Sequence, residues 1–319
     1  MPPDLAGRVA NSFAERIRRL EKLQLSPYAT RSYATAGRLR PEDECEVRTP
    51  FQRDRDRILH SKAFRRLKGK TQVFIDPRGD HYRTRMTHTL ETTGIARVVA
   101  RALGLNEDLT EAIGLGHDMG HTPFGHAGEE ALDAALHARH GLHFRHNEQS
   151  LAIAERLNLT AEVRDGILTH TGERRPETLE GRIVRIVDRV AYINHDIDDA
   201  IRHGLLTPDD LPAAEIELLG TSGSTRIDLL VHDLVESSAD SGDICQSDEV
   251  GEAMLALRAF MFERVYLAPE ARAEHERARL VVQRIFDHLD ARGDEPEEIV
   301  GFVAGMTDRF ALQFADELP

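Results

Sequence analysis

The stretch Gly114-Leu-Gly-His-Asp-Met-Gly-His-Thr-Pro-Phe-Gly-His-Ala-Gly-Glu129 decides how the rest of the chain is interpreted. It holds three histidines and two acidic residues, and glycine and proline interrupt it repeatedly. The pair His117-Asp118 ends an apolar helical pattern that contains Ile113 and Leu115, where polar residues are costly to bury without a partner. Neutral imidazole and carboxylate are both good ligands for a divalent cation, so the pair predicts a metal site. A lone His-Asp dipeptide is more often a surface pair, and this prediction therefore depends on further ligands.

Two residues outside this stretch suit the same ion. His88 lies near the start of a second amphipathic helical pattern. Asp188 lies in Arg182-Ile-Val-Arg-Ile-Val-Asp-Arg-Val-Ala191, which is apolar almost all round and therefore typical of a buried helix. A buried carboxylate there needs a cation or a strong hydrogen-bond partner. Tyr192 and Asp196 follow at four-residue intervals and share its face, which we interpret as a pocket wall; a solvated polar stripe is the alternative.

The composition favours helix over sheet, because aromatic residues make up only 5% of the 319 residues and tryptophan is absent. A net charge of −14 argues against broad non-specific binding to nucleic acid. Between Arg48 and Arg85, however, twelve Lys or Arg residues stand against four Asp or Glu. This local excess indicates one anion-binding site, and a basic outer helix face is the alternative.

The cysteine content and the absence of long apolar stretches indicate the compartment. Cys45 and Cys245 stand in unrelated contexts, so we expect a reduced cytoplasmic protein without a disulfide framework. The first residues contain no apolar signal-peptide region, and no apolar stretch approaches the ~20 residues that a membrane span needs. We therefore expect a soluble protein that does not contact a membrane.

Apolar periodicity predicts a mainly α chain with an irregular arm at residues 25–50. A short strand is expected at Thr71–Ile75, a turn at Asp76–Gly79, a connection at Thr207–Ser224 and a loop at Ser237–Asp248. Helices are predicted at residues 8–24, 53–68, 85–103, 107–118, 127–140, 146–157, 161–170, 180–203, 225–238, 248–267, 270–291 and 296–315. The predicted organisation is an N-terminal helix and arm (1–50), a catalytic core (51–206) and a C-terminal helical region packed on the core (207–319).

Taken together, the motifs resemble a known family. They are Arg85-x-x-His88, His117-Asp118, Asp188, Phe51-Gln-Arg-Asp-Arg-Asp-Arg57, Arg65-Arg-Leu-Lys-Gly-Lys-Thr-Gln72 and His146-Asn-Glu-Gln149. The chain is similar to the deoxyguanosine triphosphate triphosphohydrolase family of HD proteins, and most of all to its short bacterial members. The matching motifs cover about residues 50–200. The resemblance implies a mainly α, HD-domain helical fold with a C-terminal helical extension.

The resemblance also implies the reaction and the metal ligands. The activity would be hydrolysis of deoxynucleoside triphosphates at the α-phosphorus, with release of the deoxynucleoside and inorganic triphosphate. The ligands would be His88, His117, Asp118 and Asp188, which suit a divalent ion such as Mn, Mg, Fe, Co or Ni. Such an ion lowers the pKa of a bound water and polarises the phosphorus.

Further roles follow from the resemblance position by position. The residues matching catalytic positions are His121, His126, Glu129 and His146, and either His121 or His146 could protonate the leaving oxygen. The alternative for each of the three histidines is that it only caps a helix or bonds to the backbone. The residues matching substrate-binding positions are Arg85 and Arg189 for the phosphates, and Gln72, Tyr192 and Asp196 for the deoxyribose. Arg258 and Tyr266 resemble a more distant phosphate and sugar pair, or else an ordinary helix face. His170 is expected to support the site rather than to react.

Other functions remain open at this point. The chain is shorter than the better-known triphosphohydrolases, which leaves base selectivity and nucleotide regulation undecided. Another HD phosphohydrolase acting on a nucleoside monophosphate or a signalling nucleotide would carry the same metal site. A regulatory protein that binds single-stranded nucleic acid is a third possibility, although the acidic charge balance does not support it. The family resemblance also implies a homo-oligomer.

Overall fold

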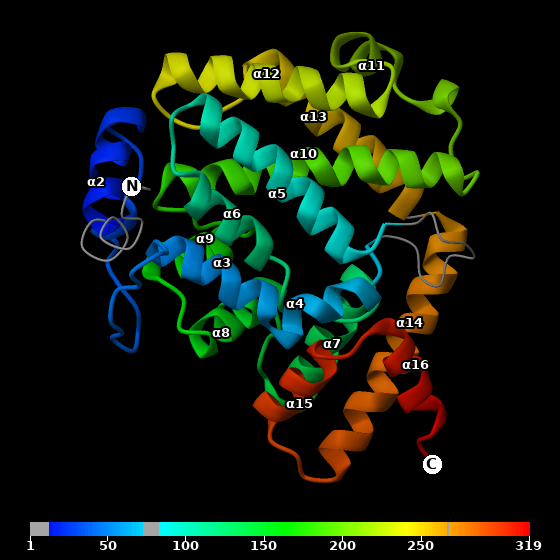
Figure 1. The fold of residues 1–319 in the computed structure, drawn as a ribbon. Coiled ribbons are helices and arrows are strands. Elements are labelled where there is room, and N and C mark those ends of the chain that lie inside the picture. Colours follow the sequence, from blue (N-terminus) through cyan, green and yellow to red (C-terminus); the bar gives the residue numbers. More distant parts are fainter. Residues whose placement is uncertain (1–12, 73–82, 267) are drawn as a thin grey trace, which may run out of the picture.

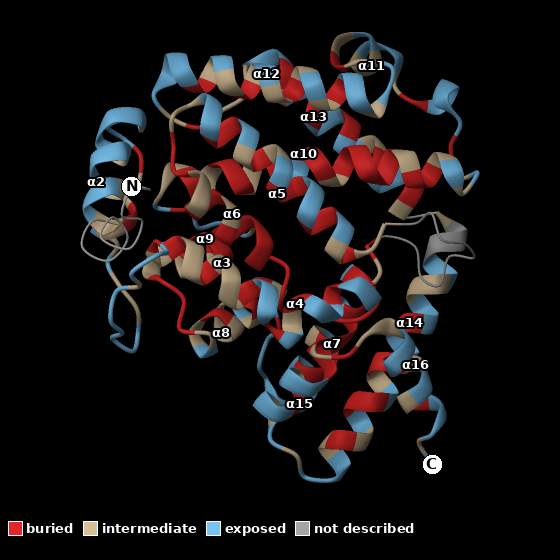
Figure 2. Ribbon diagram, viewed as in Figure 1, coloured by how far each residue is buried: buried red, intermediate tan, exposed pale blue. Residues whose placement is uncertain are grey.

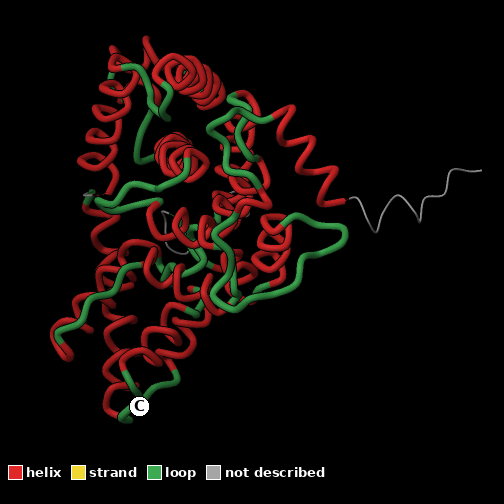
Figure 3. Tube along the Cα trace, turned by 90° about the vertical axis from the view of Figure 1, so that its left-hand side faces the viewer, coloured by secondary structure: helices red, strands yellow, loops and turns green. Residues whose placement is uncertain are grey.

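A computed structural model describes residues 13–72, 83–266 and 268–319, and in these residues helices joined by loops build the protein (Figures 1 and 3). The predicted mainly α fold is confirmed. Within these residues, β-type backbone pairing is limited to the isolated bridges Arg38–Thr160 and Thr71–Thr84. Most of the predicted strand and all of the turn after it lie outside the described residues.

The predicted metal ligands lie on or next to helices of the first two thirds of the chain. Their bounds are Phe13–Gln24 (α2), Pro50–His60 (α3), Lys62–Arg66 (α4), Arg85–Ala102 (α5), Glu107–Gly116 (α6), Gly125–His140 (α7), His146–Arg156 (α8), Ala161–Thr169 (α9) and Leu179–Arg202 (α10). The remaining helices form the C-terminal region. Their bounds are Ala213–Leu219 (α11), Gly223–Ser241 (α12), Asp248–Met261 (α13), Pro269–Ala291 (α14), Pro296–Ala304 (α15) and Asp308–Asp316 (α16). The division of this chain into three regions stays a prediction.

Several predicted boundaries were wrong because side chains that cap helices interrupt a continuous apolar pattern. Ser61 divides the helix expected at 53–68, since its hydroxyl accepts a hydrogen bond from the backbone N–H of Phe64 and starts α4. Thr307 does the same between α15 and α16, within the single helix expected at 296–315. The connection expected at Thr207–Ser224 contains α11, and the loop after α12 begins only at Gly242, which has φ +72°.

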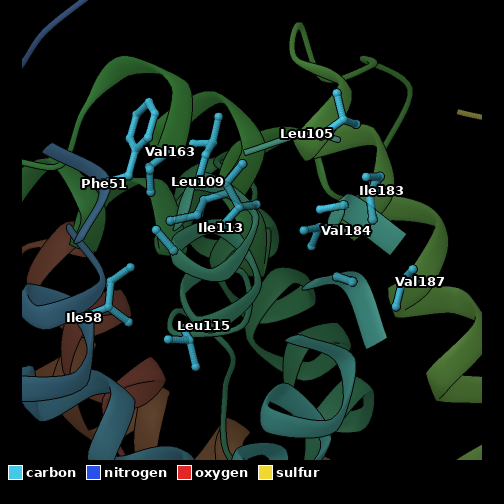
Figure 4. Close-up of a cluster of buried hydrophobic side chains, with 14 of the residues drawn as sticks. Phe51, Ile58, Leu105, Leu109, Ile113, Leu115, Val163, Ile183, Val184 and Val187 are labelled. Atoms are coloured by element: carbon cyan, nitrogen blue, oxygen red, sulfur yellow. The ribbon is translucent and has the colours of Figure 1, made fainter. Parts of the chain in front are cut away.

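The largest apolar core lies where α3, α5, α6, α9 and α10 meet (Figure 4). Leu109 and Ile113 of α6 are fully buried at its centre. Helix α9 approaches α6 closely because Gly166 has no side chain: a Cβ there would lie 2.5 Å from Cδ1 of Ile113. Helix α10 is buried along most of its length (Figure 2) and separates this core from a second one with α11 and α13. The polar residues at the ends of α6 and along α10 are therefore held by rigid, packed helices.

A third core joins the C-terminal helices to α7. Phe124, Leu132 and Leu136 pack with Val282, Phe286 and other residues of α14–α16. Helix α7 follows directly after the turn at residues 117–124, so the C-terminal region supports the predicted site from one side (Figure 1). No described helix is both long and apolar enough to span a membrane.

The contacts that attach the arm before α3 to the core include one buried ion pair. Asp54 of α3 is fully buried and forms an ion pair with Arg38 of the arm. It also accepts hydrogen bonds from the backbone N–H (2.9 Å) and the hydroxyl group (2.6 Å) of Thr160. Arg38 also donates to the carbonyl oxygens of Asn158 (2.6 Å) and Pro50 (3.0 Å). A single carboxylate thus links the arm, α3 and the start of α9.

Replacing this carboxylate should destabilise the whole chain. Asp54→Ala leaves a buried guanidinium without its partner, and we expect the free energy of unfolding to fall by about 3–5 kcal/mol. Denaturant titration followed by circular dichroism measures the change. Asp240→Asn, at an exposed position near the end of α12, is the control and should stay within about 0.5 kcal/mol of the wild-type protein. Equal stabilities of the two variants would contradict this account of the arm.

Candidate active site

The four predicted metal ligands lie together at the junction of α5, α6 and α10. Nε2 of His88 is 2.9 Å from Oδ1 of Asp188, and Nε2 of His117 is 3.5 Å from the same oxygen and 3.8 Å from Oδ1 of Asp118. His88, His117 and Asp118 are buried and form a group whose ligand atoms all lie within 4.8 Å of one another. The consecutive helices α5 and α6 and the more distant α10 therefore bring two imidazoles and two carboxylates to one point.

Hydrogen bonding fixes one proton of His117 on Nδ1. Its Nδ1–H donates to the carbonyl oxygen of Gly114 at 2.7 Å, because a carbonyl accepts only. In its neutral form, which is the form that binds a metal ion, the ring presents the lone pair of Nε2 to the carboxylates of Asp118 and Asp188. This buried Nε2 has no hydrogen-bond partner in the described part of the chain. An unpaired acceptor facing two carboxylates is unfavourable unless a cation lies between them.

A chain of three side chains orients His88 in the same way. His195 lies two turns after Asp188 in α10, and its Nε2 is 3.1 Å from a carboxylate oxygen of Glu91. Its Nδ1 is 3.4 Å from Nδ1 of His88. With the proton of His195 on Nε2, Nδ1 of His88 is the donor and its Nε2 lone pair points toward Asp188. Such outer carboxylate and imidazole groups commonly orient metal-binding histidines.

The ionisation of the cluster leads to the same conclusion. Burial lowers the pKa of His117, but the neighbouring Asp118 and Asp188 outweigh burial and raise it to about 9. Burial raises the pKa of Asp188, but His117 and His88 hold it well below its usual range. The site therefore retains negative charge on its carboxylates and attracts either a proton or a metal ion. The donor set fits a divalent cation with nitrogen and oxygen ligands.

The predicted catalytic residues form a second cluster that adjoins the first. Both carboxylate oxygens of Glu129 are 2.9 Å from Nδ1 of His146, and one of them is 3.6 Å from His121 and from His126. The rings of His121 and His146 are stacked with centroids 4.5 Å apart. Burial raises the pKa of Glu129, but hydrogen bonds from His126 and His146 lower it far more. Glu129 is thus an anionic centre that orients three imidazoles.

The three imidazoles around Glu129 differ in burial and in hydrogen bonding. Nε2 of His146 is 3.2 Å from Nε2 of His170, whose own Nδ1–H donates to a carbonyl oxygen, so His146 needs a proton on both nitrogens. Burial and Arg85 lower the pKa of His121, both of whose nitrogens are buried without a partner in the described residues. His126 is the exposed member, and its ring centroid lies 6.2 Å from that of Tyr192.

Arg85 is a buried cation whose hydrogen-bonding capacity is only partly used. Its Nη1 donates to Oδ2 of Asp118 at 2.7 Å, while Nε and Nη2 are buried and have no partner among the residues described. Its side chain is 3% exposed, so water does not fully replace the missing partners. A guanidinium with unused donors beside a metal site is suited to bind a phosphate group.

The residues predicted to bind the sugar include two unpaired acceptors. Oε1 of Gln72 and Oδ1 of Asp196 are buried and lack hydrogen-bond partners within the described chain. The hydroxyl of Tyr266 donates to the other oxygen of Asp196, and the rings of Tyr266 and Tyr192 are stacked 5.9 Å apart. The structure thus groups Tyr192, Asp196 and Tyr266, of which Tyr266 had also been interpreted as part of an ordinary helix face.

Arg189 and Arg258 lie at a separate opening. They line a cavity of about 380 Å³ between α10 and α13, together with Gln246 and Ser247 at the start of α13. Arg189 directly follows Asp188 in sequence, but none of the four predicted ligands lines this cavity. Asp248 and Glu252 line it as well, so its two arginines do not give it a net positive charge.

His195 and Asp308 support the site but were not predicted from the sequence. His195 stands in an apolar helix, and only its spacing of seven residues from Asp188 indicates that the two share a face. Asp308 of α16 accepts from the backbone N–H groups of Thr71 (2.8 Å) and Phe124 (2.9 Å). Phe124 has φ +62°, an uncommon conformation for a residue with a side chain, and this hydrogen bond stabilises it. No local signal connects Asp308 with a turn almost two hundred residues earlier.

Comparison with known families agrees with this site. Residues 85–193 match the HD domain, and residues 244–298 match the phosphohydrolase-associated domain. The first match begins at Arg85 and includes the four clustered ligands from His88 to Asp188. These matches place the chain in the class of HD-domain phosphohydrolases, whose members are metal-dependent hydrolases.

The curated relatives define the family more narrowly. A deoxyguanosinetriphosphate triphosphohydrolase-like protein of Caldanaerobacter subterraneus subsp. tengcongensis is 52% identical over 92% of this chain and 91% of its own length. Proteins with the same description from Desulfatibacillum aliphaticivorans and Clostridium perfringens are 45% and 44% identical, over 90% and 93% of this chain and 92% and 94% of their own lengths. The chain belongs to this deoxyguanosinetriphosphate triphosphohydrolase-like family.

A solved structure supports the fold alone. The crystal structure of a hypothetical protein from Aquifex aeolicus at 2.0 Å resolution matches 83% of this chain and 68% of that chain. The TM-score is 0.51 and the sequence identity is 18%.

Removing one imidazole should abolish metal binding. His117→Ala deletes the nitrogen that faces both carboxylates, and we expect the purified protein to lose its divalent ion, as measured by inductively coupled plasma mass spectrometry. A chelator should lower the melting temperature of the wild-type protein but not that of the variant, because only the ion-bound state gains stability from binding. His143→Ala, at a largely exposed histidine, is the control and should retain the ion. Retention of the ion by His117→Ala would contradict the assignment.

Proposed function

We propose that the protein hydrolyses deoxynucleoside triphosphates to the deoxynucleoside and inorganic triphosphate. The observation that carries the proposal is Arg85, a buried guanidinium with two unused donor atoms that is bonded to Asp118 of the metal cluster. A phosphate bound there lies beside the ion. The relatives are described as deoxyguanosinetriphosphate triphosphohydrolase-like proteins, which supports a deoxynucleoside triphosphate as the substrate.

Four residues of the chain hold the ion in this proposal. They are His88, His117, Asp118 and Asp188, with His195 and Glu91 orienting the first of them. A bound divalent ion supplies a Lewis acid that lowers the pKa of water and polarises a phosphoryl group. Mn, Mg, Fe, Co and Ni all accept this donor set.

The histidines around Glu129 provide for proton transfer. The leaving oxygen belongs to the deoxynucleoside, so its proton must come from the side of the site that faces the sugar. His126 meets this requirement, because it lies beside Tyr192 and pairs with Glu129, which stabilises a charged imidazole. His146 lies within hydrogen-bond distance of both Glu129 and His170. His121, whose pKa burial holds well below its usual range, stacks on His146 and stays neutral.

The unpaired acceptors give the site a preference for a sugar hydroxyl. Oε1 of Gln72 and Oδ1 of Asp196 each need a donor when buried, and the 3′-hydroxyl of a deoxynucleotide supplies one, which we assign to Asp196. The stacked rings of Tyr192 and Tyr266 form the apolar wall against which the sugar packs. Arg189 and Arg258, in the cavity between α10 and α13, bind the outer phosphates. A homo-oligomer and a cytoplasmic location remain predictions.

The products distinguish this activity from those of other phosphohydrolases. We expect each of the four deoxynucleoside triphosphates, incubated with the protein and Mn or Mg, to yield free deoxynucleoside and intact inorganic triphosphate in equal amounts. Anion-exchange and reversed-phase chromatography measure the two products. Arg85→Gln should lower kcat/KM by about 10²-fold or more, since it removes a charge-assisted phosphate contact. Orthophosphate or pyrophosphate as the inorganic product would indicate a different HD phosphohydrolase.

A substrate without the 3′-hydroxyl tests the role of Asp196. The wild-type protein should hydrolyse a 2′,3′-dideoxynucleoside triphosphate with kcat/KM roughly 10²-fold lower or more, because buried acceptors then stay unpaired. Asp196→Ala should lose most of this discrimination, since it removes the acceptor. Steady-state kinetics of both proteins with both substrates give the interaction energy between Asp196 and the 3′-hydroxyl.

Tyr266→Phe is the matched control for this cycle. It removes the donor to Asp196 but keeps the ring, so discrimination against the dideoxy substrate should persist. Undiminished discrimination in Asp196→Ala would exclude a contact between Asp196 and the 3′-hydroxyl.

A further inference from the structure

A second basic cavity lies behind the catalytic turn, between α4, α8 and α15. Its volume is about 320 Å³, at the lower end of the range of ~300–1,000 Å³ for pockets that hold small molecules. Its walls include Met119, which belongs to the turn after Asp118, and Gly301 and Gly305 from the C-terminal region. None of the residues assigned to the metal, the phosphates or the sugar lines it.

The charges that line this cavity are all positive. Lys62 and Arg66 come from the α4 segment, Arg156 comes from the end of α8, and Lys70 closes the inner end. The described lining contains no aspartate or glutamate. Lys62, Arg66 and Arg156 form no ion pair with any residue that the structure describes, although the chain carries 55 acidic residues. Elsewhere most arginines near α3 and α6 are paired with carboxylates, as Arg53 is with Glu42.

Lys70 makes the cavity more than an exposed basic patch. Its side chain is 2% exposed, and its ammonium group donates to the carbonyl oxygens of His121 and, at 2.6 Å, of Ala304. An ammonium group has three N–H donors, of which these contacts use two. No carboxylate bonds to this buried amine in the described chain, and burial together with Arg85 lowers its pKa to about 7 although Asp308 opposes the shift. An anion bound in the cavity would favour the charged ammonium form.

We propose that this cavity is a binding site for a small anion that carries phosphate groups, separate from the metal site. Arginine side chains bind phosphate oxygens through paired hydrogen bonds, and four cations around one cavity suit a multiply charged anion better than a monocarboxylate. The apolar walls and the small volume favour a compact anion such as inorganic phosphate or triphosphate over a nucleic-acid backbone. Because Met119 lines the cavity and Lys70 bonds to the carbonyl group of His121, a bound anion would lie close to the catalytic turn.

This inference does not depend on the proposed function. It rests on the cavity, its unpaired cations and Lys70, and it would stand if the protein hydrolysed another nucleotide. Binding is therefore measured without turnover, by isothermal titration calorimetry of the full chain with inorganic phosphate and with inorganic triphosphate. The background is an R189Q/R258Q variant freed of divalent ions by a chelator, which weakens the phosphate contacts proposed at the metal site and between α10 and α13. Arg85 is retained in every variant, so any binding that remains at the metal site contributes equally to all of them.

Substitutions in the cavity locate the binding site. In this background we expect Arg66→Gln and Arg156→Gln each to weaken the binding of triphosphate by about tenfold or more. Arg65→Gln is the matched control, because Arg65 is an exposed neighbour on the same helix that does not line the cavity, and it should leave the affinity within about twofold. Triphosphate should bind more tightly than phosphate because it carries more charge.

A steric substitution tests the same site without changing its charge. Gly301 lines the cavity, and a Cβ there meets no atom within 4 Å, so Gly301→Leu places a side chain in open space. It should abolish triphosphate binding while the melting temperature stays at or above that of the background, since leucine favours helix more than glycine.

Three results would overturn the proposal. The first is the absence of anion binding in the R189Q/R258Q background. The second is an equal loss of affinity in Arg65→Gln and Arg66→Gln, which would indicate general electrostatic attraction. The third is binding of a single-stranded oligonucleotide but of neither free anion, which would assign the basic residues to a polymer.

Discussion

Four groups that accept but do not donate meet at one buried point, and the rest of the structure depends on how their charge is balanced. The Nε2 lone pairs of His88 and His117 face the carboxylates of Asp118 and Asp188. The second nitrogen of each ring is committed elsewhere, to His195 and to a backbone carbonyl group. Burying such a set without a cation costs several kcal/mol per charge. The helices that carry it must therefore be held rigidly enough to keep the cluster from separating.

The packing supplies that rigidity from two directions. Helices α5, α6 and α10 share the largest apolar core, so the ligands project from elements that cannot shift independently. The turn after Asp118 has no such core of its own. Gly120 allows it to approach α8, since a Cβ there would lie 2.2 Å from the backbone nitrogen of Ser150. Asp308 and Lys70 then fix the turn to the C-terminal helices through Phe124 and His121. The C-terminal region is thus part of the site although it provides none of the four predicted ligands.

The ligands on the packed helices could be predicted from the sequence, whereas the long-range hydrogen bonds that hold the turn could not. Periodicity and cost of burial identified His88, His117, Asp118 and Asp188 because each ligand interrupts an apolar helix, and the helices at 85–103 and 180–203 were located to within one residue. Family resemblance supplied the roles of residues outside that cluster. The caps at Ser61 and Thr307 were missed, because a serine or threonine inside an amphipathic pattern is also an ordinary exposed residue. Asp308 was missed because its partners lie 184 and 237 positions away.

The buried polar atoms of the pocket that lack hydrogen-bond partners indicate which groups a ligand must offer. Arg85 has donors without acceptors, whereas Gln72 and Asp196 have acceptors without donors. Each such atom costs about 1–3 kcal/mol in the free protein, and a ligand that pairs it recovers that free energy on binding. A ligand that pairs all of them must be anionic at the end near Asp118 and must offer a hydroxyl group near Tyr266. A nucleotide with a free 3′-hydroxyl meets both conditions, whereas inorganic phosphate meets only the first. A ligand of this kind would return to the protein the free energy that these unpaired atoms cost, which a ligand that meets only one condition could not do.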